Sequence, residues 1–294
     1  MKKKWILIGG LLGFLLNLAS LSYGADKERV SLRISGGLSR FALGDFNAFI
    51  IDTQRFQLDN LRSVGYGATE EFKTLHGGRD LEVSILFPLG QGFSLAVGTG
   101  LLTTGSADNL LVLVSSFSRL TTDLSYNIKT IPVTAGIRIN LPLSSAMSVV
   151  VFGGGGLYFA RFTETGDKNL ILFSGTRGYE KSWDVETSAA GWGGFAGLGI
   201  ELRIIKGLSL LVEASGRLAR ISGFSGDSRT LFYSSENKES LKLLYYEFSP
   251  SGGGAFYSAL NLPDAPIGYP LRTLRDAVID FSGWSIRTGF KITL

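Results

Sequence analysis

The sequence has a single histidine, His76, whose side chain could act as a general base, and Glu70, Glu71 and Asp80 lie close to it in the chain. A general base must reach the proton of a nucleophile through a hydrogen bond, and no serine is paired with His76 at the spacing of a strand. Two glycines follow the histidine, so it is better interpreted as a loop residue. A metal site with one histidine and no cysteine would need a complement of carboxylates that the sequence does not show. We therefore expect no catalytic residue, no metal and no cofactor.

Nine charged residues occupy the polar positions of segments in which apolar and polar residues alternate. Alternate residues of a strand face the same side, so all nine are expected to line the interior of a closed sheet. They are Arg33, Glu82, Arg138, Glu201, Arg203, Glu213, Arg217, Arg287 and Lys291. Charges in such an interior must pair, and we predict a network in which the three glutamates meet the facing arginines. The network could line a narrow or gated pore. A structural plug is the preferred interpretation, because these side chains and water can fill a narrow lumen.

Composition excludes several other classes of protein. Cysteine is absent, which excludes a disulfide framework, a thiolate metal site and a lipid-attachment cysteine. Of the 29 Lys and Arg residues three lie at positions 2–4, which leaves 26 against 25 Asp and Glu, a net charge of +1 for the rest of the chain. This charge balance does not indicate a nucleic-acid partner. Residues 191–196 fit the loose dinucleotide pattern G-x-G-x-x-A, but they lead into an alternating segment instead of a helix, which excludes a dinucleotide site.

Alternation recurs in eight segments, each of which we expect to be a strand. They are residues 30–40, 81–87, 93–101, 124–141, 149–162, 192–204, 208–218 and 278–294. The connections alternate between long and short, with short turns at 88–92, 142–147 and 205–207 and long loops between the other strands. A soluble barrel would also show regular strands, but this asymmetry of loop length is typical of transmembrane barrels.

One of these segments changes the parity of its apolar positions. They are even-numbered as far as Ile128 and odd-numbered from Ile131 onward, with Pro132 at the change. A proline cannot donate to the ladder of a sheet, and β-bulges are places where strands accommodate one. We predict a single long strand with a bulge near Ile131 and Pro132.

The first and last long connections contain further patterns. In the first, Asp45 is suited to the N-cap of a helix, and four apolar residues could share one helical face: Phe46, Phe49, Ile50 and Leu61. We expect a short helix packed on its neighbours, with a position over the barrel mouth or on the membrane surface as alternatives. Two apolar runs, 110–115 and 241–248, could pair as additional strands, which would give a ring of ten strands.

The N-terminal residues have the pattern of an export signal. Lysines at positions 2–4 precede an apolar run, 5–16, and small residues follow up to Gly24. We predict a cleaved signal peptide, 1–24, and a single mature domain, 25–294. A membrane-anchoring helix is the alternative, because this leader is about as long as a membrane span.

The chain resembles the small bacterial outer-membrane barrels of the OmpA and OmpX type, within the broad outer-membrane β-barrel domain family. The residues that carry the resemblance are the leader, Ile131–Val133, the glycine-rich Val149–Tyr158, Gly197–Gly199 and the terminal Gly289–Leu294. The resemblance implies a location in the outer membrane of a Gram-negative-type cell, with membrane lipid and lipopolysaccharide around the barrel. It also implies recognition of the last strand by the barrel-assembly machinery. Such barrels usually end on an aromatic residue, whereas this chain ends on Leu294.

We thus predict an all-β protein, an eight-stranded antiparallel up-and-down transmembrane barrel with long outer loops. The function we expect is structural or interactive, with the loops available to an extracellular partner, and not enzymatic. A narrow pore or transporter for small or apolar solutes is the first alternative. A lipid-modifying enzyme of the outer leaflet that uses His76 is the second.

Overall fold

Eight antiparallel strands close into a ring in the computed structural model. The structure describes residues 29–63, 67–71, 73–90, 92–174, 177–233, 235–248, 257–260 and 271–294, so the predicted signal peptide lies outside the described residues. In order around the ring the strands are β1 (Ser31–Phe41), β3 (Gly77–Gly90), β4 (Phe93–Thr104), β6 (Ser118–Pro142), β7 (Met147–Leu172), β8 (Arg177–Ile205), β9 (Leu208–Ile221) and β16 (Gly283–Thr293). Pairing of β16 with both β9 and β1 closes the ring.

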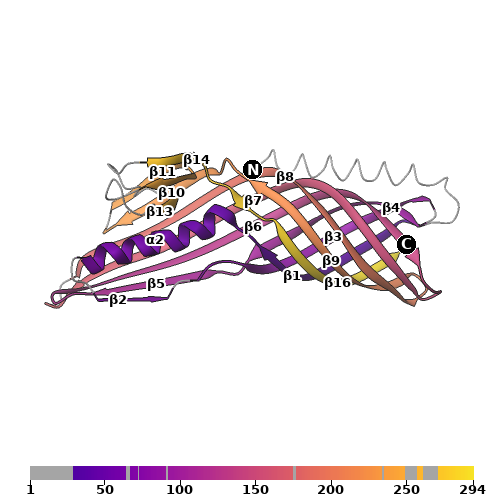
Figure 1. Ribbon diagram of the computed structural model, residues 1–294, viewed down its shortest axis with the longest axis horizontal. Helices are drawn as coiled ribbons and strands as arrows, with labels where there is room; N and C mark the ends of the chain where they lie inside the picture. The colour runs from indigo at the N-terminus through magenta and orange to yellow at the C-terminus, as the bar shows by residue number, and fades with distance from the viewer. Residues whose placement is uncertain are drawn as a thin grey trace.

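Each of the eight predicted segments overlaps one strand of the ring, and the prediction of an antiparallel all-β fold is confirmed. The short turns join β3 to β4, β6 to β7 and β8 to β9 at one end of the ring, where the C-terminus also lies (Figure 1). Within the described ranges, no helix is long and apolar enough to cross a membrane.

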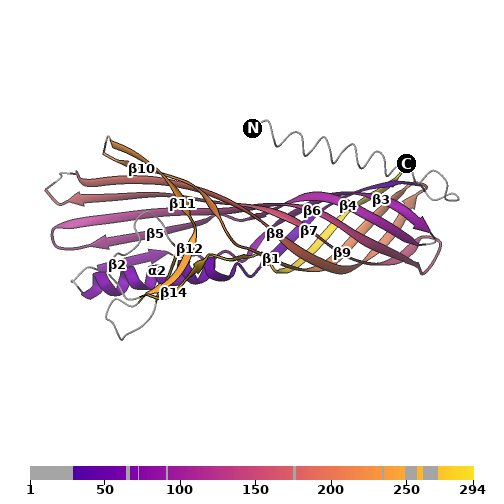
Figure 2. The same ribbon diagram turned by 90° about the horizontal axis from the view of Figure 1, so that it is seen from above.

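Beyond the other end of the ring, three strands continue into a long sheet that we call the extension. It comprises residues 118–130 of β6, 160–172 of β7 and 177–190 of β8, and it projects well past the ring in both views (Figures 1 and 2). Neighbouring strands widen it: β2 (Gly67–Glu71), β5 (Ala107–Val114), β10 (Ser225–Phe232) and β11 (Ser235–Lys242). The predicted loop at 163–190 is therefore wrong, because β7 and β8 stay paired almost to their tight connection.

The remaining elements lie beside the extension. They are α2 (Gly44–Ser63), the small sheet of β12 (Leu244–Phe248), β13 (Tyr257–Leu260) and β14 (Leu271–Asp276), and the short β15 (Ile279–Asp280). The two runs considered as extra ring strands thus do form strands, at β5 and at β11 and β12, but these pair outside the ring.

Helix α2 forms where a helix was expected. The N-terminal half of α2 closes the end of the ring that adjoins the extension. Phe46 is fully buried, with its ring centroid 5.4 Å from that of Tyr126 and 5.3 Å from that of Phe162. Asp45 lies inside the first turn instead of capping it, and its carboxylate accepts hydrogen bonds from Arg275 at 2.5 and 2.7 Å. The main apolar core therefore lies at the junction of ring and extension, and not in the middle of the ring.

Strand β6 keeps one facing pattern from end to end, so the predicted bulge near Ile131 and Pro132 is wrong. The strand pairs with β4 and with β7 without any shift of register, and its even-numbered residues point inward throughout. The parity of the apolar positions changes because the interior changes. It is apolar around Tyr126, beside α2, and charged around Arg138, where only the outward face is apolar.

Candidate functional site

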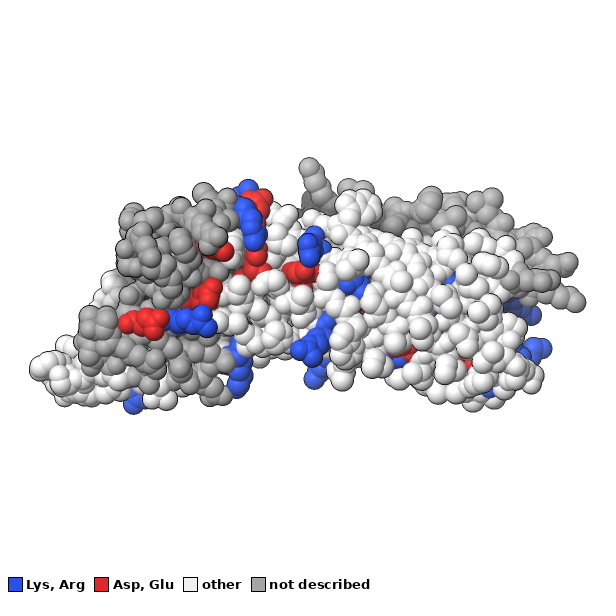
Figure 3. All heavy atoms as spheres, viewed as in Figure 1, with Lys and Arg blue, Asp and Glu red and all other residues white. Residues whose placement is uncertain are grey.

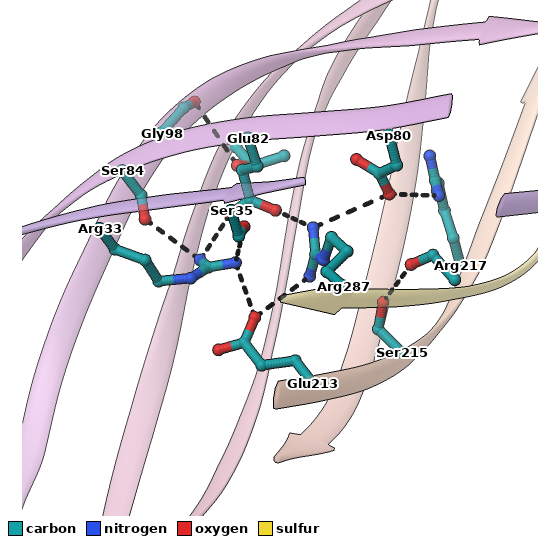
Figure 4. Close-up of polar contacts among 12 residues, drawn as sticks. Arg33, Ser35, Asp80, Glu82, Ser84, Gly98, Glu213, Ser215, Arg217 and Arg287 are labelled. Atoms are coloured by element: carbon teal, nitrogen blue, oxygen red, sulfur yellow. Dashed lines mark hydrogen bonds and ion pairs between the residues drawn. The ribbon is translucent and has the colours of Figure 1, made fainter. Parts of the chain in front are cut away.

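The ring interior holds a cluster of ion pairs (Figure 4). The cluster lies on the side of the apolar core that faces the short turns. Arg33 on β1 donates from Nη1 to Glu82 Oε1 at 2.7 Å and from Nη2 to Glu213 Oε2 at 2.9 Å. Arg138 Nη1 donates to the other oxygen of Glu213 at 2.6 Å, and Arg287 contacts both glutamates. Glu213 thus gathers three arginines from β1, β6 and β16, at 1% side-chain exposure. Strand alternation places these groups on a common face, and the closed ring then directs that face inward.

Hydroxyl groups and an aromatic ring complete the surroundings of the arginines. Ser84 and Ser35 accept hydrogen bonds from Arg33 at 3.1 and 3.2 Å. The guanidinium carbon of Arg138 lies 5.8 Å from the centroid of the Phe152 ring, within range of a cation–π contact. Inward glycines leave room for this packing, since a Cβ on Gly197 would lie 2.5 Å from Phe152 Cζ.

Asp80 belongs to the cluster, although its position in the sequence predicts a loop residue. Its carboxylate lies 3.4 Å from Arg217 Nη2 and 3.9 Å from Arg287 Nη1, and Ser39 donates to it at 3.2 Å. The predicted strand begins at Leu81, whereas β3 begins four residues earlier, at Gly77, and so includes Asp80. Even parity, shared with Glu82, was the signal that could have placed Asp80 in the interior.

Two of the nine predicted residues lie away from the centre of the cluster, and a third has no ion pair. Lys291 and Glu201 contact each other near the end with the short turns, so Glu201 meets a lysine where arginines were expected. Arg203 has inward parity but is exposed at the mouth of the ring, and no ion pair joins it to any described residue. It borders an open hollow of about 480 Å³ together with Glu201 and Lys291.

The enclosed spaces beside the charge cluster are small. One cavity of about 30 Å³ borders Asp80, Glu82, Arg217 and Arg287, and another of about 20 Å³ borders Arg33 and Arg138. Each has room for about one or two water molecules. The apolar core that contains Phe46 and Tyr126 lies between these cavities and the extension. The described part of the ring therefore has a filled interior.

The outward face of the ring has the opposite character, because large apolar side chains cover it. Figure 3 shows a nearly uncharged surface over the ring, with charged side chains gathered over the junction with the extension and at the far end. The exposed outward residues include Ile34, Leu38, Leu81, Val83, Ile131, Ile137, Val151, Phe159, Trp192, Leu198, Ile200, Val212, Leu218, Trp284, Ile286 and Phe290. Contiguous apolar surface of this extent on a folded protein marks contact with a membrane or a partner.

His76 lies in the segment just before β3 and is exposed. Its Nε2 is 3.0 Å from the hydroxyl of Thr74, and its Nδ1 is 3.4 Å from the side-chain nitrogen of Asn47. Asn47 is already engaged with the backbone of Leu75 through both its amide oxygen and its nitrogen. The hydroxyl–imidazole pair was not anticipated from the sequence, and His76 borders none of the cavities described above.

Comparison with solved structures finds several chains that match, and one of them is an outer membrane protein. The outer membrane protein OprG from Pseudomonas aeruginosa matches with a TM-score of 0.35 and 12% sequence identity, over 91% of this chain and 97% of that one. No family model matches the sequence, and no curated protein matches it.

Proposed function

We propose that this chain is an integral outer-membrane protein whose ring of eight strands spans the bilayer as a closed barrel. The observation that carries the proposal is the reversal of polarity across the ring wall. Glu213 and Arg138 are buried inside, whereas Leu198 and Leu218 are 62% and 76% exposed outside. In water, a folded protein is more stable when its apolar side chains are buried and its charged side chains are exposed. In the hydrocarbon of a bilayer, a barrel is more stable with an apolar outer face and a polar interior, as seen here.

The height of the apolar face supports a spanning position. On β6 the outward apolar positions run from Ile131 to Leu141. Ten residue steps at about 3.3 Å, on a strand tilted by roughly 40°, cover about 25 Å, which is the height of the apolar band of such barrels. Phe159, Trp192 and Trp284 lie toward one edge of the band, and Phe93 and Phe290 toward the other, as in aromatic girdles at membrane interfaces.

In this proposal the short turns and the C-terminus face the periplasm and the extension faces the cell exterior. The surrounding outer-membrane lipid and lipopolysaccharide contact the apolar face, and the barrel-assembly machinery recognises β16. The extension, with the exposed strand β11, is the part available to an extracellular partner.

The role we propose for the barrel is structural or interactive and not enzymatic. Ion pairs cross the interior of the ring, and an apolar core fills it at the junction with the extension. Both features disfavour the pore alternative. The lipid-enzyme alternative would rest on the pair of Thr74 and His76, which borders none of the cavities described above.

Localisation provides the first test. The full chain is expressed in a Gram-negative host, inner and outer membranes are separated, and the outer fraction is washed with alkaline carbonate. We expect the chain to remain in the washed outer membrane, with faster gel migration unboiled than boiled. Recovery in the soluble periplasm, or release by the wash, would contradict the proposal.

A further inference from the structure

Basic side chains line the edge of the apolar face that adjoins the extension. Arg79 on β3, Thr103 on β4, Lys129 on β6 and Arg161 on β7 are directly opposite one another in neighbouring strands, so they form one row across the outer surface. All three basic residues of the row are exposed. Arg40 on β1 continues the row one outward position beyond Leu38, the residue that faces Arg79. We call Arg79, Lys129 and Arg161 the basic row.

The basic row carries more positive charge than its surroundings neutralise. Lys129 and Arg161 are directly opposite each other, and like charges in that relationship destabilise a sheet. Glu186 on β8 forms an ion pair with Arg161. Among the described residues no carboxylate pairs with Arg79 or Lys129. An anion from outside the protein would relieve the repulsion.

The depth of the basic row indicates where that anion would come from. From the basic row toward the short turns, the next residues that point to the outside of the ring are apolar. On β6 and β7 these are Ile131 and Phe159, which lie opposite each other two residues along from Lys129 and Arg161. Trp284, opposite Arg40, is exposed at the same edge. In the proposed membrane position, the aromatic side chains mark the level of the headgroups. The basic row then lies where lipid phosphates lie.

We propose that the basic row binds a lipid whose headgroup carries more than one phosphate, in the leaflet that faces the extension. This inference rests on the proposed membrane position. Strands are about 4.8 Å apart, so Lys129 and Arg161 can share one phosphate. Arg79 lies two strands from Lys129, about 10 Å away, and takes a second phosphate of the same headgroup. Arginine can bind each phosphate through two parallel hydrogen bonds, and Glu186 holds the Arg161 side chain beside the site.

The test uses the full chain, purified from membranes in a neutral detergent and titrated with bisphosphorylated lipid A. Binding is measured by native mass spectrometry, with phosphatidylcholine as the neutral lipid and inorganic phosphate as a competitor. The test variant combines Arg79→Gln and Lys129→Gln. The matched control combines Arg119→Gln and Lys238→Gln, which remove two exposed basic groups of the extension. Each variant is first checked for the heat-dependent shift in gel mobility.

We expect the test variant to keep the mobility shift and to bind lipid A about 25-fold more weakly, since each of the two basic groups near a charged membrane contributes on the order of a fivefold gain in binding. The control and Lys129→Arg should bind as the original chain does. Equal binding by the test variant, or full displacement by inorganic phosphate at the same concentration as the lipid, would overturn the inference. Loss of the mobility shift in the original chain would instead contradict the membrane position, and the inference would fall with it.

Discussion

Arg138 on β6 and Glu213 on β9 form a 2.6 Å ion pair although two strands, β7 and β8, separate their own strands in the ring. The pair therefore crosses the interior instead of running along the wall. Both side chains are at most 2% exposed, and Glu213 also contacts Arg33 and Arg287. A single carboxylate on β9 thus contacts arginines from three other strands, and this arrangement contributes to the filled interior of the ring.

Replacing Glu213 by Ala should destabilise the barrel strongly. The change leaves three arginines with one carboxylate fewer in a buried site, and removing one partner of a buried pair costs about 3–5 kcal/mol. The free energy of unfolding is measured by urea titration in detergent micelles. Arg203→Gln is the control, because Arg203 has the same inward parity but is exposed at the mouth, and its effect should stay within about 0.5 kcal/mol. Equal effects of the two changes would show that the cluster does not stabilise the ring.

The filled interior predicts that the barrel does not conduct ions. The two described cavities that border the cluster are small, about 30 and 20 Å³, and Phe46 lies in the apolar core between the cluster and the extension. The measurement is the current across a planar bilayer after addition of the purified chain, compared with detergent alone. We expect no stepwise current. Regular steps of constant size would favour the pore alternative and would require the interior to open in the membrane.

Phe46→Ala should loosen the junction between ring and extension. Phe46 is fully buried against Tyr126 and Phe162, and removal of a buried phenyl ring costs about 3–5 kcal/mol. We expect faster proteolysis within α2. The unboiled variant should still migrate faster on a gel than the boiled one, because the ring stays closed. Ile51→Ala is the control on the same helix, because Ile51 is 42% exposed. Equal rates of cleavage in the two variants would mean that α2 is not held through Phe46.

Glu164 should make the stability of the extension depend on pH. It lies on β7 beyond Arg161, outside the segment that we propose to cross the membrane. Burial raises its pKa from 4.5 to about 7, and its carboxylate accepts a hydrogen bond from the Trp183 indole nitrogen at 2.8 Å. The folded-state pKa is above the unfolded one, so its contribution to stability is greatest below about pH 4.5, declines as the pH rises toward 7, and is constant above that.

Glu164→Gln removes this titration while it keeps the hydrogen-bond acceptor. The variant should match the original chain near pH 4 and exceed it near pH 8, by at most about 3 kcal/mol for a shift of this size. Unfolding in urea, followed by tryptophan fluorescence at both values of pH, gives the comparison. Glu239→Gln, on the exposed strand β11, should show no such difference. A stability gap of the same size at both values of pH would contradict the assignment.

Much of the ring could be predicted from the sequence because outward apolar and inward polar residues alternate with a period of two. This period identified the strands that carry Arg33, Glu82 and Glu213, and the structure brings these three residues together. The ends of the strands were harder to predict than the face on which each residue lies. Asp80 was missed and Arg203 was placed too deep, because parity gives the face of a residue but not its height along the strand.

The part of the extension that β7 and β8 form was predicted to be a loop, and the reason for this error is physical. There the outward face of β7 and β8 is polar, with residues such as Arg161 and Glu186, while the inner face packs on α2 and its neighbours. The apolar parity is thus the reverse of that in the ring. The same reversal on β6 was interpreted as a bulge at Pro132, although the strand is regular.

The polarity of the ring wall is the central claim, and spin labels can test it directly. The sequence has no cysteine, so single substitutions can be labelled without any other change. Labels at Leu198→Cys and Val212→Cys, both outward on the ring, are compared in proteoliposomes with one at Lys238→Cys on the extension. We predict that the first two are relaxed by oxygen dissolved in the bilayer and hardly by a water-soluble nickel chelate, and that the third shows the reverse. Strong relaxation of the Leu198 and Val212 labels by the nickel chelate would place the ring in water and contradict the account.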